Sequence, residues 1–211
     1  MKRIIFFLFI ATIGIVSCKD KKTTTEKDAV ATEQKTPEMA AADPAKDSTK
    51  VRTVIMNFYN WYNTSFTKFQ EYHLYGGIKK KDMPPYKINW DQVTKYQDFI
   101  RTSVPQLGDE FLSNQKKFFQ QCDSAFKVDV EDELPYGFDY DWYTNSQEDP
   151  SYLLDGINKS AKWMINVKGK EASVEIGAPD HKDYLAGSLL LYVGMKKENG
   201  KWTIAKISGI E

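Results

Sequence analysis

Carboxylate side chains, which can bind a metal ion or act in catalysis, are concentrated in one segment of the chain, 128–158. This segment contains no lysine and no arginine. Clustered carboxylate and amide oxygens are ligands of the kind that Ca²⁺ takes. The spacing of an EF-hand fails, however, because Tyr143 stands two residues after Asp141, where that pattern needs Asp or Asn. We therefore predict no metal site in this segment. Its carboxylates are Asp129, Glu131, Asp132, Glu133, Asp139, Asp141, Glu148, Asp149 and Asp155.

Aromatic residues stand among these carboxylates and favour a recognition surface. Rings beside carboxylates and amides suit sugars or the centre of a contact with another protein. To act as a glycosidase pair, Asp139 and Asp141 would need a defined separation across a cleft, and nearness in sequence shows none. We therefore predict a binding site and assign no catalytic residue. The predicted binding residues are Tyr136, Asp139, Asp141, Trp142 and Asn145.

The histidines and the second cysteine form no catalytic pattern. No spacing places His73 and His181 together on one helical face, so we expect no zinc site. His181 lies beside carboxylates and could serve as a base for Ser188, but we interpret its surroundings as a polar surface loop. Cys122 follows two phenylalanines at helical spacing, which predicts a buried core cysteine. Phosphate loops, dinucleotide fingerprints and nucleophile elbows are missing from the sequence, and we expect no cofactor.

The first residues resemble the processing signal of a bacterial lipoprotein. A basic tripeptide opens the chain, and an uncharged run, 4–16, follows it. This run is shorter than the roughly 20 apolar residues that span a bilayer, so it predicts a cleaved signal peptide over 1–17. Ile15-Val16-Ser17-Cys18 resembles a lipobox, which implies that Cys18 becomes the lipidated N-terminus. Acyl chains such as palmitate there would anchor the protein, because each buried CH₂ adds about 0.8 kcal/mol.

The segment 18–50 predicts a flexible, disordered linker between the lipid and a folded domain. It has no aromatic residue and cannot bury enough apolar surface to offset the entropy of ordering. We therefore place a single globular domain at 51–211.

The charge of the chain argues against a nucleic-acid partner. Basic and acidic residues balance at 29 each. Because Lys2 and Arg3 leave with the signal peptide, the mature protein is slightly acidic. An acidic protein lacks the basic surface on which nucleic-acid binding depends.

Helical periodicity dominates the start of the domain. Apolar residues recur at helical spacing over 51–71, which predicts a first helix with Ser48 or Thr49 as its N-cap. The following stretch, 79–85, contains three lysines and ends in paired prolines. Paired prolines oppose helices and strand ladders, so this stretch is predicted to be a loop.

Two further helices are expected to form a hairpin. Asn89 or Asp91 can cap the second helix, which should end near Pro105. The third helix is expected to begin at that proline, because proline is tolerated in a first helical turn.

In the last third of the domain, apolar and polar residues alternate one by one, as they do in a β-strand with one buried face. Apolar and polar residues alternate over 163–167 and again over 172–176, and the stretches 188–196 and 202–207 form a second pair. An Asn-Gly turn separates this second pair and is a strong hairpin signal. Helices followed by four antiparallel strands predict an α+β domain with its helices packed on one face of the sheet.

Three stretches resemble the DUF3828 group of bacterial secreted and lipoprotein domains. They are Phe58-Tyr59-Asn60-Trp61-Tyr62, the segment from Asp139 to Asp149, and Asn199-Gly200-Lys201-Trp202-Thr203-Ile204. The resemblance covers nearly all of 51–211. It implies an NTF2-like or cystatin-like cone, in which N-terminal helices pack on a curved four-stranded antiparallel sheet. It implies no chemistry, because that family is functionally uncharacterised. The wider NTF2-like class includes both enzymes and binding proteins, so the fold leaves function open.

Together these features predict a membrane-tethered lipoprotein of the cell envelope, periplasmic or surface-exposed, that binds a ligand or a protein without catalysis. The expected partners are the membrane, through the lipid anchor, and an envelope protein or a glycan. Exposed sheet edges also favour a homodimer.

Two other functions stay open. An NTF2-like enzyme would use an acidic residue in the cone cavity, and it requires a carboxylate or histidine with a shifted pKa facing an open pocket. A structural or immunity-type protein would instead show a filled cone and an exposed apolar patch.

Overall fold

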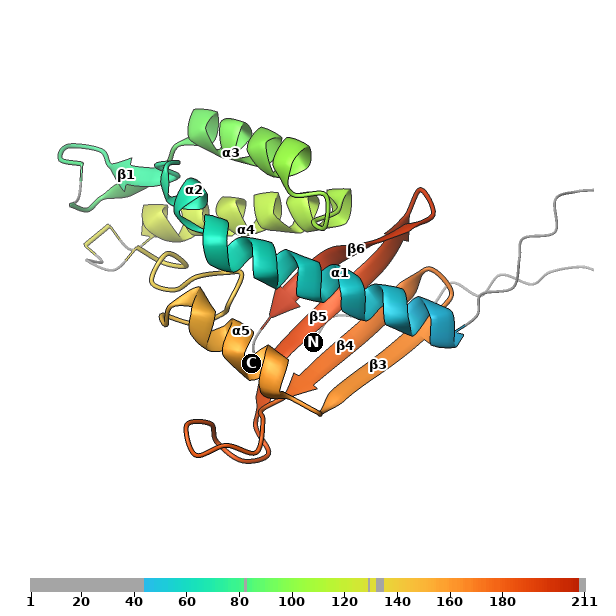
Figure 1. The fold of residues 1–211 in the computed structure, drawn as a ribbon. Coiled ribbons are helices and arrows are strands. Elements are labelled where there is room, and N and C mark those ends of the chain that lie inside the picture. Colours follow the sequence, from blue (N-terminus) through green and yellow to red (C-terminus); the bar gives the residue numbers. More distant parts are fainter. Residues whose placement is uncertain (1–43, 82, 129, 132–134, 209–211) are drawn as a thin grey trace, which may run out of the picture. The chain divides into compact units, whose positions relative to one another are not determined.

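In the described part of the chain, the computed structural model has five helices and two short strands ahead of the four strands of its main sheet (Figure 1). The described residues are 44–81, 83–128, 130–131 and 135–208. The predicted signal peptide, Cys18 and most of the predicted linker therefore lie outside them. Within the described ranges, none of the helices has the length and apolar character that crossing a bilayer requires.

Four antiparallel strands form the main sheet in the order β3-β4-β5-β6 (Figure 1). At the β5–β6 turn, Asn199 and Gly200 have φ angles of 49° and 79°, as a tight Asn-Gly hairpin turn requires. This confirms the predicted α+β class and both predicted hairpins. The strands are β3, Trp163–Lys168; β4, Glu171–Gly177; β5, Leu189–Glu198; and β6, Lys201–Ser208.

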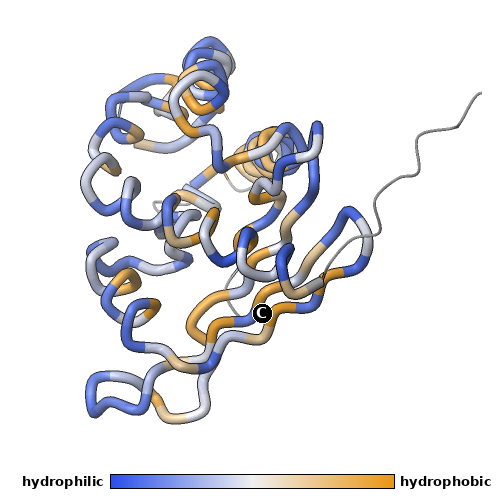
Figure 2. The backbone as a smooth tube through the Cα atoms, turned by 45° about the vertical axis from the view of Figure 1, so that its right-hand side comes forward, coloured by the Kyte–Doolittle hydropathy of each residue, from blue (hydrophilic) through white to orange (hydrophobic). Residues whose placement is uncertain are grey.

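Helix α1, Pro44–Ser65, packs against β3 and β6 of this sheet (Figure 1). Val51, Ile55 and Phe58 recur at helical spacing on its inner face, and all three are completely buried. Figure 2 shows the same pattern as hydrophobic and hydrophilic segments that alternate along the helices and strands.

The start of α1 corrects the predicted boundary between linker and domain. The helix begins at Pro44, so the end of the predicted 18–50 linker is helical, and Ser48 and Thr49 lie inside the helix instead of capping it. Proline suits a first helical turn. Asp47 in that turn is only 3% exposed, and its Oδ2 lies 3.0 Å from Lys197 Nζ on β5. This contact fixes the early turns of α1 to the second hairpin.

The rest of the predicted first helix is broken. It ends at Ser65, and a short helix α2, Thr67–Gln70, follows. The stretch 79–85 is a connection as predicted, but it joins two short strands that the sequence did not reveal. Strands β1, Tyr75–Gly77, and β2, Tyr86–Ile88, pair antiparallel on either side of it.

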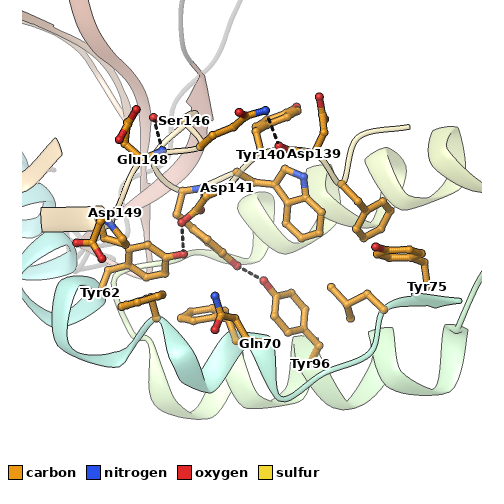
Figure 3. A pocket seen from close by; sticks show the side chains of 18 residues that line it. Tyr62, Gln70, Tyr75, Tyr96, Asp139, Tyr140, Asp141, Ser146, Glu148 and Asp149 are labelled. Carbon is orange, nitrogen blue, oxygen red and sulfur yellow. Dashed lines mark hydrogen bonds between the residues drawn. The ribbon is translucent and has the colours of Figure 1, made fainter. Parts of the chain in front are cut away.

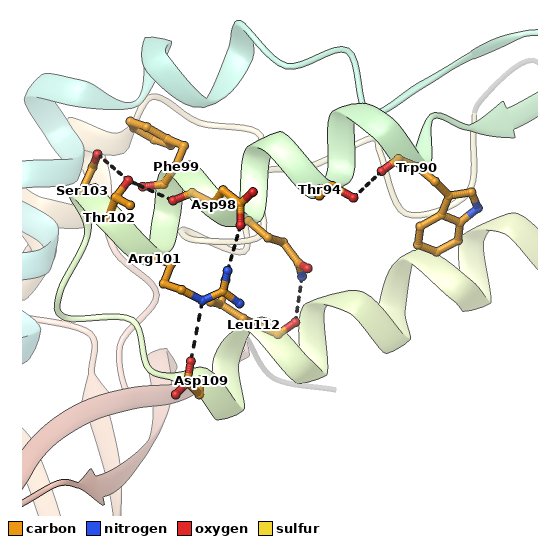
Figure 4. A network of polar contacts seen from close by, with 10 residues as sticks. Trp90, Thr94, Asp98, Phe99, Arg101, Thr102, Ser103, Asp109 and Leu112 are labelled. Atoms are coloured by element: carbon orange, nitrogen blue, oxygen red, sulfur yellow. Dashed lines mark hydrogen bonds and ion pairs between the residues drawn. The ribbon is translucent and has the colours of Figure 1, made fainter.

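Helices α3, Trp90–Ser103, and α4, Asp109–Val128, are the predicted second and third helices. Asn89 caps α3 as predicted, since its Oδ1 accepts a 3.4 Å hydrogen bond from Gln92 N. Figure 4 shows α3 beside α4, where Arg101 Nε of α3 lies 3.9 Å from Asp109 Oδ1 at the start of α4. Within α3, Arg101 Nη1 lies 2.9 Å from Asp98 Oδ1. These ion pairs are exposed and so contribute little to stability.

Helix α4 begins at Asp109 and not at Pro105, because the residues between them extend the edge of the sheet. Gly108 N donates to Ile204 O at 3.0 Å, and Ile204 N donates to Gln106 O at 2.7 Å. Glu198 then caps the helix from β5, because its carboxylate accepts hydrogen bonds from the backbone N–H groups of residues 109 and 110. Pairing with a distant strand left no signal in the local sequence.

Helix α5, Pro150–Lys159, was not predicted. Asp149 is its N-cap and accepts a 2.9 Å hydrogen bond from Ser151 N, and Pro150 occupies the first turn. Its buried residues, Leu153 and Ile157 among them, attach it to α1 and β5. The helix holds the end of the acidic aromatic segment against the domain.

Candidate functional site

An open pocket with a volume of about 930 Å³ lies between the loop 138–149 and the helices α1 and α2 (Figure 3). We call it the acidic pocket. The loop supplies one wall and brings three predicted binding residues, Asp139, Asp141 and Trp142, into one site. The opposite wall contains Tyr62, Phe66, Phe69, Gln70, Leu74, Tyr75 and Tyr96, which sequence reasoning did not connect with the loop.

Asp141 is the most enclosed carboxylate of the acidic pocket. Its Oδ2 accepts a 2.6 Å hydrogen bond from the Tyr62 hydroxyl, and its Oδ1 accepts a 2.7 Å hydrogen bond from Tyr143 N (Figure 3). Burial raises the pKa of the Asp141 carboxyl above its ordinary value, while the hydrogen bonds from Tyr62 and Tyr143 oppose this rise. Both oxygens of Asp141 are thus engaged in holding the loop on α1.

A hydrogen-bonded network of buried tyrosines holds the part of the loop that follows Asp141. The Tyr143 hydroxyl lies 2.5 Å from the Tyr96 hydroxyl (Figure 3) and accepts a 3.1 Å hydrogen bond from Gln115 Nε2. Tyr59 donates to the backbone carbonyl of Tyr143 at 2.8 Å. Burial raises the pKa of Tyr59, Tyr96 and Tyr143 above the usual tyrosine range, so all three hydroxyls stay protonated. The network fixes the loop to α1, α3 and α4.

Trp142 lines the acidic pocket and also packs against aromatic residues of the core. Its ring contacts Phe118, Phe119 and Phe138 edge-on, with ring centroids 5.1 to 5.7 Å apart. Its Nε1 donates a 2.6 Å hydrogen bond to Gly137 O. Trp142 therefore shapes the pocket wall and also belongs to the core.

The exposed carboxylates of the acidic pocket lie at its rim. Asp139, Glu148 and Asp149 line the pocket and are exposed. Together with Asp141 they make four lining carboxylates, and none of the described lining residues is a lysine, arginine or histidine. Asp149 is already occupied as the cap of α5, so Asp139 and Glu148 are the carboxylates best placed to meet a ligand.

The other two predicted binding residues belong to a neighbouring pocket. Tyr136 and Asn145 line a pocket of about 610 Å³, which shares Tyr140 and Trp142 with the acidic pocket. Tyr136 is 54% exposed. Asn145 has a φ of 51°, a left-handed conformation that asparagine tolerates better than most residues. The loop thus forms part of two pockets instead of one site.

The remaining sequence predictions have simple structural outcomes. Cys122 is completely buried, as predicted, and burial raises the pKa of its thiol to about 12. His181 Nδ1 lies 3.1 Å from Asp183 Oδ2 in an exposed loop, and the Ser188 hydroxyl donates to Leu185 O, so the two do not pair. In the described part of the chain, no group of three or more His, Cys, Asp and Glu side chains is arranged to hold a metal ion.

Comparisons of the chain with family models, with curated proteins and with solved structures found no match.

Proposed function

We propose that this protein is a membrane-tethered, non-catalytic binding module of the cell envelope and that its main ligand is a small organic cation. One observation carries the choice of ligand. Of the residues that the structure describes, four carboxylates and no basic side chain line the acidic pocket. Such a rim attracts a cation and repels an anionic ligand.

The aromatic walls favour an organic cation over a simple metal ion. Tyrosine, phenylalanine and tryptophan rings make up much of the pocket lining. The face of such a ring attracts a cation within about 6 Å, and alkylated ammonium groups gain from this contact because they also bury apolar surface. A volume of about 930 Å³ leaves room for a ligand of ordinary metabolite size.

Binding fits the geometry of Asp141 better than catalysis does. Both of its oxygens already accept hydrogen bonds from the chain, at 2.6 Å and 2.7 Å. A carboxylate held in this way positions the loop and is poorly placed to take a proton from a substrate.

The proposed lipid anchor is supported by the sequence alone. The lipobox-like Ile15-Val16-Ser17-Cys18 supports lipidation of Cys18 and hence a place in the cell envelope. An envelope protein or a glycan as a further partner, and a homodimer formed through an exposed sheet edge, belong to the same proposal.

We also propose that the resemblance to the DUF3828 group, and the NTF2-like or cystatin-like cone that it implies, holds for this domain. In support, the long helix α1 packs against both β3 and β6, which are the two outer strands of the four-stranded sheet.

An enzyme that uses Asp141 is the second candidate function. It is favoured by one observation, namely that Asp141 lines an open pocket and has a pKa raised by burial. Such an enzyme needs a group that works with the carboxylate. Besides three exposed carboxylates, the described lining residues offer only tyrosine hydroxyls, one serine and amides. An activity abolished by Asp141→Asn, with a pH profile that follows the raised pKa, would favour this second candidate.

A matched pair of probes tests the proposed ligand class. Choline and 3,3-dimethylbutan-1-ol have nearly the same shape, but only choline is charged. Titration of the domain with each, followed by NMR, should show that choline binds at least about tenfold more tightly and shifts the signals of Tyr62, Asp139 and Glu148. Equal affinity for both probes would contradict the proposal.

A further inference from the structure

The second pocket, defined above by Tyr136 and Asn145, has a chemistry unlike that of the acidic pocket. It lies between the loop, α4 and the end of β6, and has a volume of about 610 Å³. Among the described residues, no carboxylate lines it, and Lys206 is the one charged side chain that does. A cation is therefore not its natural ligand.

Side-chain amides take the place of carboxylates in this pocket. Asn114, Gln115, Gln121 and Asn145 all line it. An amide offers both a hydrogen-bond donor and an acceptor, as the hydroxyl groups of a neutral polyol do. Two of these amides already donate hydrogen bonds, Asn114 Nδ2 to Ala205 O at 3.2 Å and Gln115 Nε2 to the Tyr143 hydroxyl at 3.1 Å.

Within the described part of the chain, Gln115 lines the pocket with one end of its amide unpaired. It is 7% exposed, and its Nε2 donates to the Tyr143 hydroxyl at 3.1 Å. Its Oε1 is buried and has no hydrogen-bond partner among the described residues. Exchanging the two ends of the amide would only move the unpaired group to the nitrogen. A buried acceptor without a donor is costly. Because Gln115 lines the pocket, a rotation of its side chain that brings Oε1 to a ligand hydroxyl would remove that cost.

Aromatic rings complete the site. Tyr136 and Tyr140 are 54% and 36% exposed, and they line the pocket together with Trp142. Exposed rings beside amides give the two contacts that a sugar ring needs, an apolar face to stack on and polar groups to bind its hydroxyls.

We propose that this second pocket binds a neutral saccharide, with the rings of Tyr136 and Tyr140 against the sugar and the amides of Gln115 and Asn145 against its hydroxyls. Tyr140 and Trp142 line both pockets, but Tyr136 and the amides of Gln115 and Asn145 line only the second one, and the carboxylates that carry the cation site line only the first. Either proposal can therefore fail without the other.

Maltotriose and triacetylchitotriose are suitable neutral probes, and the side-chain NH₂ signals of Gln115 and Asn145 are the reporters. The full chain is titrated with each sugar and followed by NMR. We expect at least one probe to bind with a dissociation constant below about 10 mM and to shift both reporters.

Matched variants separate this pocket from its neighbour. Tyr136→Ala combined with Asn145→Gly removes a surface ring and a surface amide while the glycine keeps the left-handed backbone. This double variant should weaken saccharide binding by about tenfold or more. Asp139→Asn combined with Glu148→Gln, which changes only the acidic pocket, should leave saccharide binding unchanged.

Three results would overturn the inference: no shift of either reporter with either probe, equal saccharide affinity in the Tyr136→Ala, Asn145→Gly variant, or shifts confined to the acidic pocket.

Discussion

The hydroxyl of Tyr62 donates a 2.6 Å hydrogen bond to Asp141 Oδ2, which joins the first long helix to a loop 79 residues further along the chain. Both walls of the acidic pocket depend on this contact, because Tyr62 belongs to one wall and Asp141 to the other. The position of the exposed carboxylates on the loop therefore follows from the packing of α1.

Removing the Tyr62 hydroxyl should loosen the loop. Tyr62→Phe is expected to lower the free energy of unfolding by about 1.5–3 kcal/mol, because a part-buried hydrogen bond to a charged group is lost. The pKa of Asp141 should rise further, since the hydrogen bond from Tyr62 lowers it. Urea unfolding measures the first effect and NMR titration the second. Tyr72→Phe is the control, and an equal loss of stability there would argue against a special role for the Tyr62–Asp141 contact.

Gly137 should not tolerate a side chain. It has a φ of 76°, and a Cβ there would lie 2.5 Å from Phe118 Cζ and 3.0 Å from Cys122 Sγ. Gly137→Ala is expected to lower the free energy of unfolding by about 1–3 kcal/mol through overpacking, in addition to backbone strain. Gly169→Ala is a matched control, because Gly169 also has a positive φ, of 61°, but open space around it. Thermal unfolding that shows equal losses in the two variants would rule out the clash.

The contact of Asp47 with Lys197 should make stability depend on pH. The hydrogen bond from Lys197 holds the pKa of the Asp47 carboxyl below its ordinary value, so the folded state favours the charged form. This stabilisation is present above the unfolded-state pKa of about 3.9 and is lost as the pH falls below it. Asp47→Asn should therefore destabilise the protein at neutral pH and make little difference in acid. Urea midpoints measured at both pH values test this, and a deficit that persists in acid would show that charge is not the cause.

Cys122 should be unreactive in the folded protein. It is completely buried, and burial raises the pKa of its thiol to about 12, so almost no thiolate exists at neutral pH. In a Cys18→Ser variant, iodoacetamide should label Cys122 only after urea is added. Rapid labelling without urea would mean that α4 opens readily or that the thiol is exposed.

Local signals predicted most of the elements. Asn89 marked the start of α3, and the Asn-Gly pair marked the last hairpin, because caps and tight turns depend on a few neighbouring residues. Asp149-Pro150 is an equally local signal, a cap followed by a first-turn proline, and it could have revealed α5. The start of α4 could not be predicted, since Glu198 caps it from a distant strand.

The candidate site was predictable only on one side. Composition identified the loop with Asp139, Asp141 and Trp142, because a long stretch without basic residues is visible in the sequence. The residues of the facing wall on α1 and α2 show the ordinary sequence pattern of an amphipathic helix, so nothing in the sequence indicated that Phe66 and Gln70 line a pocket. Nor did the sequence show that Tyr136 and Asn145 line a different pocket, since that pocket is completed by α4 and by the end of β6, which lies far away in the sequence.

The most direct test of the proposed cation site removes its free charge and measures choline affinity. Asp139→Asn combined with Glu148→Gln neutralises two exposed carboxylates of the acidic pocket. Asp91→Asn combined with Glu175→Gln changes the net charge equally at positions that do not line it. The first variant should bind choline about tenfold more weakly than the native protein, and the second should bind it normally. If both variants bind choline as the native protein does, or if the native protein does not bind it, the acidic pocket is not a cation site.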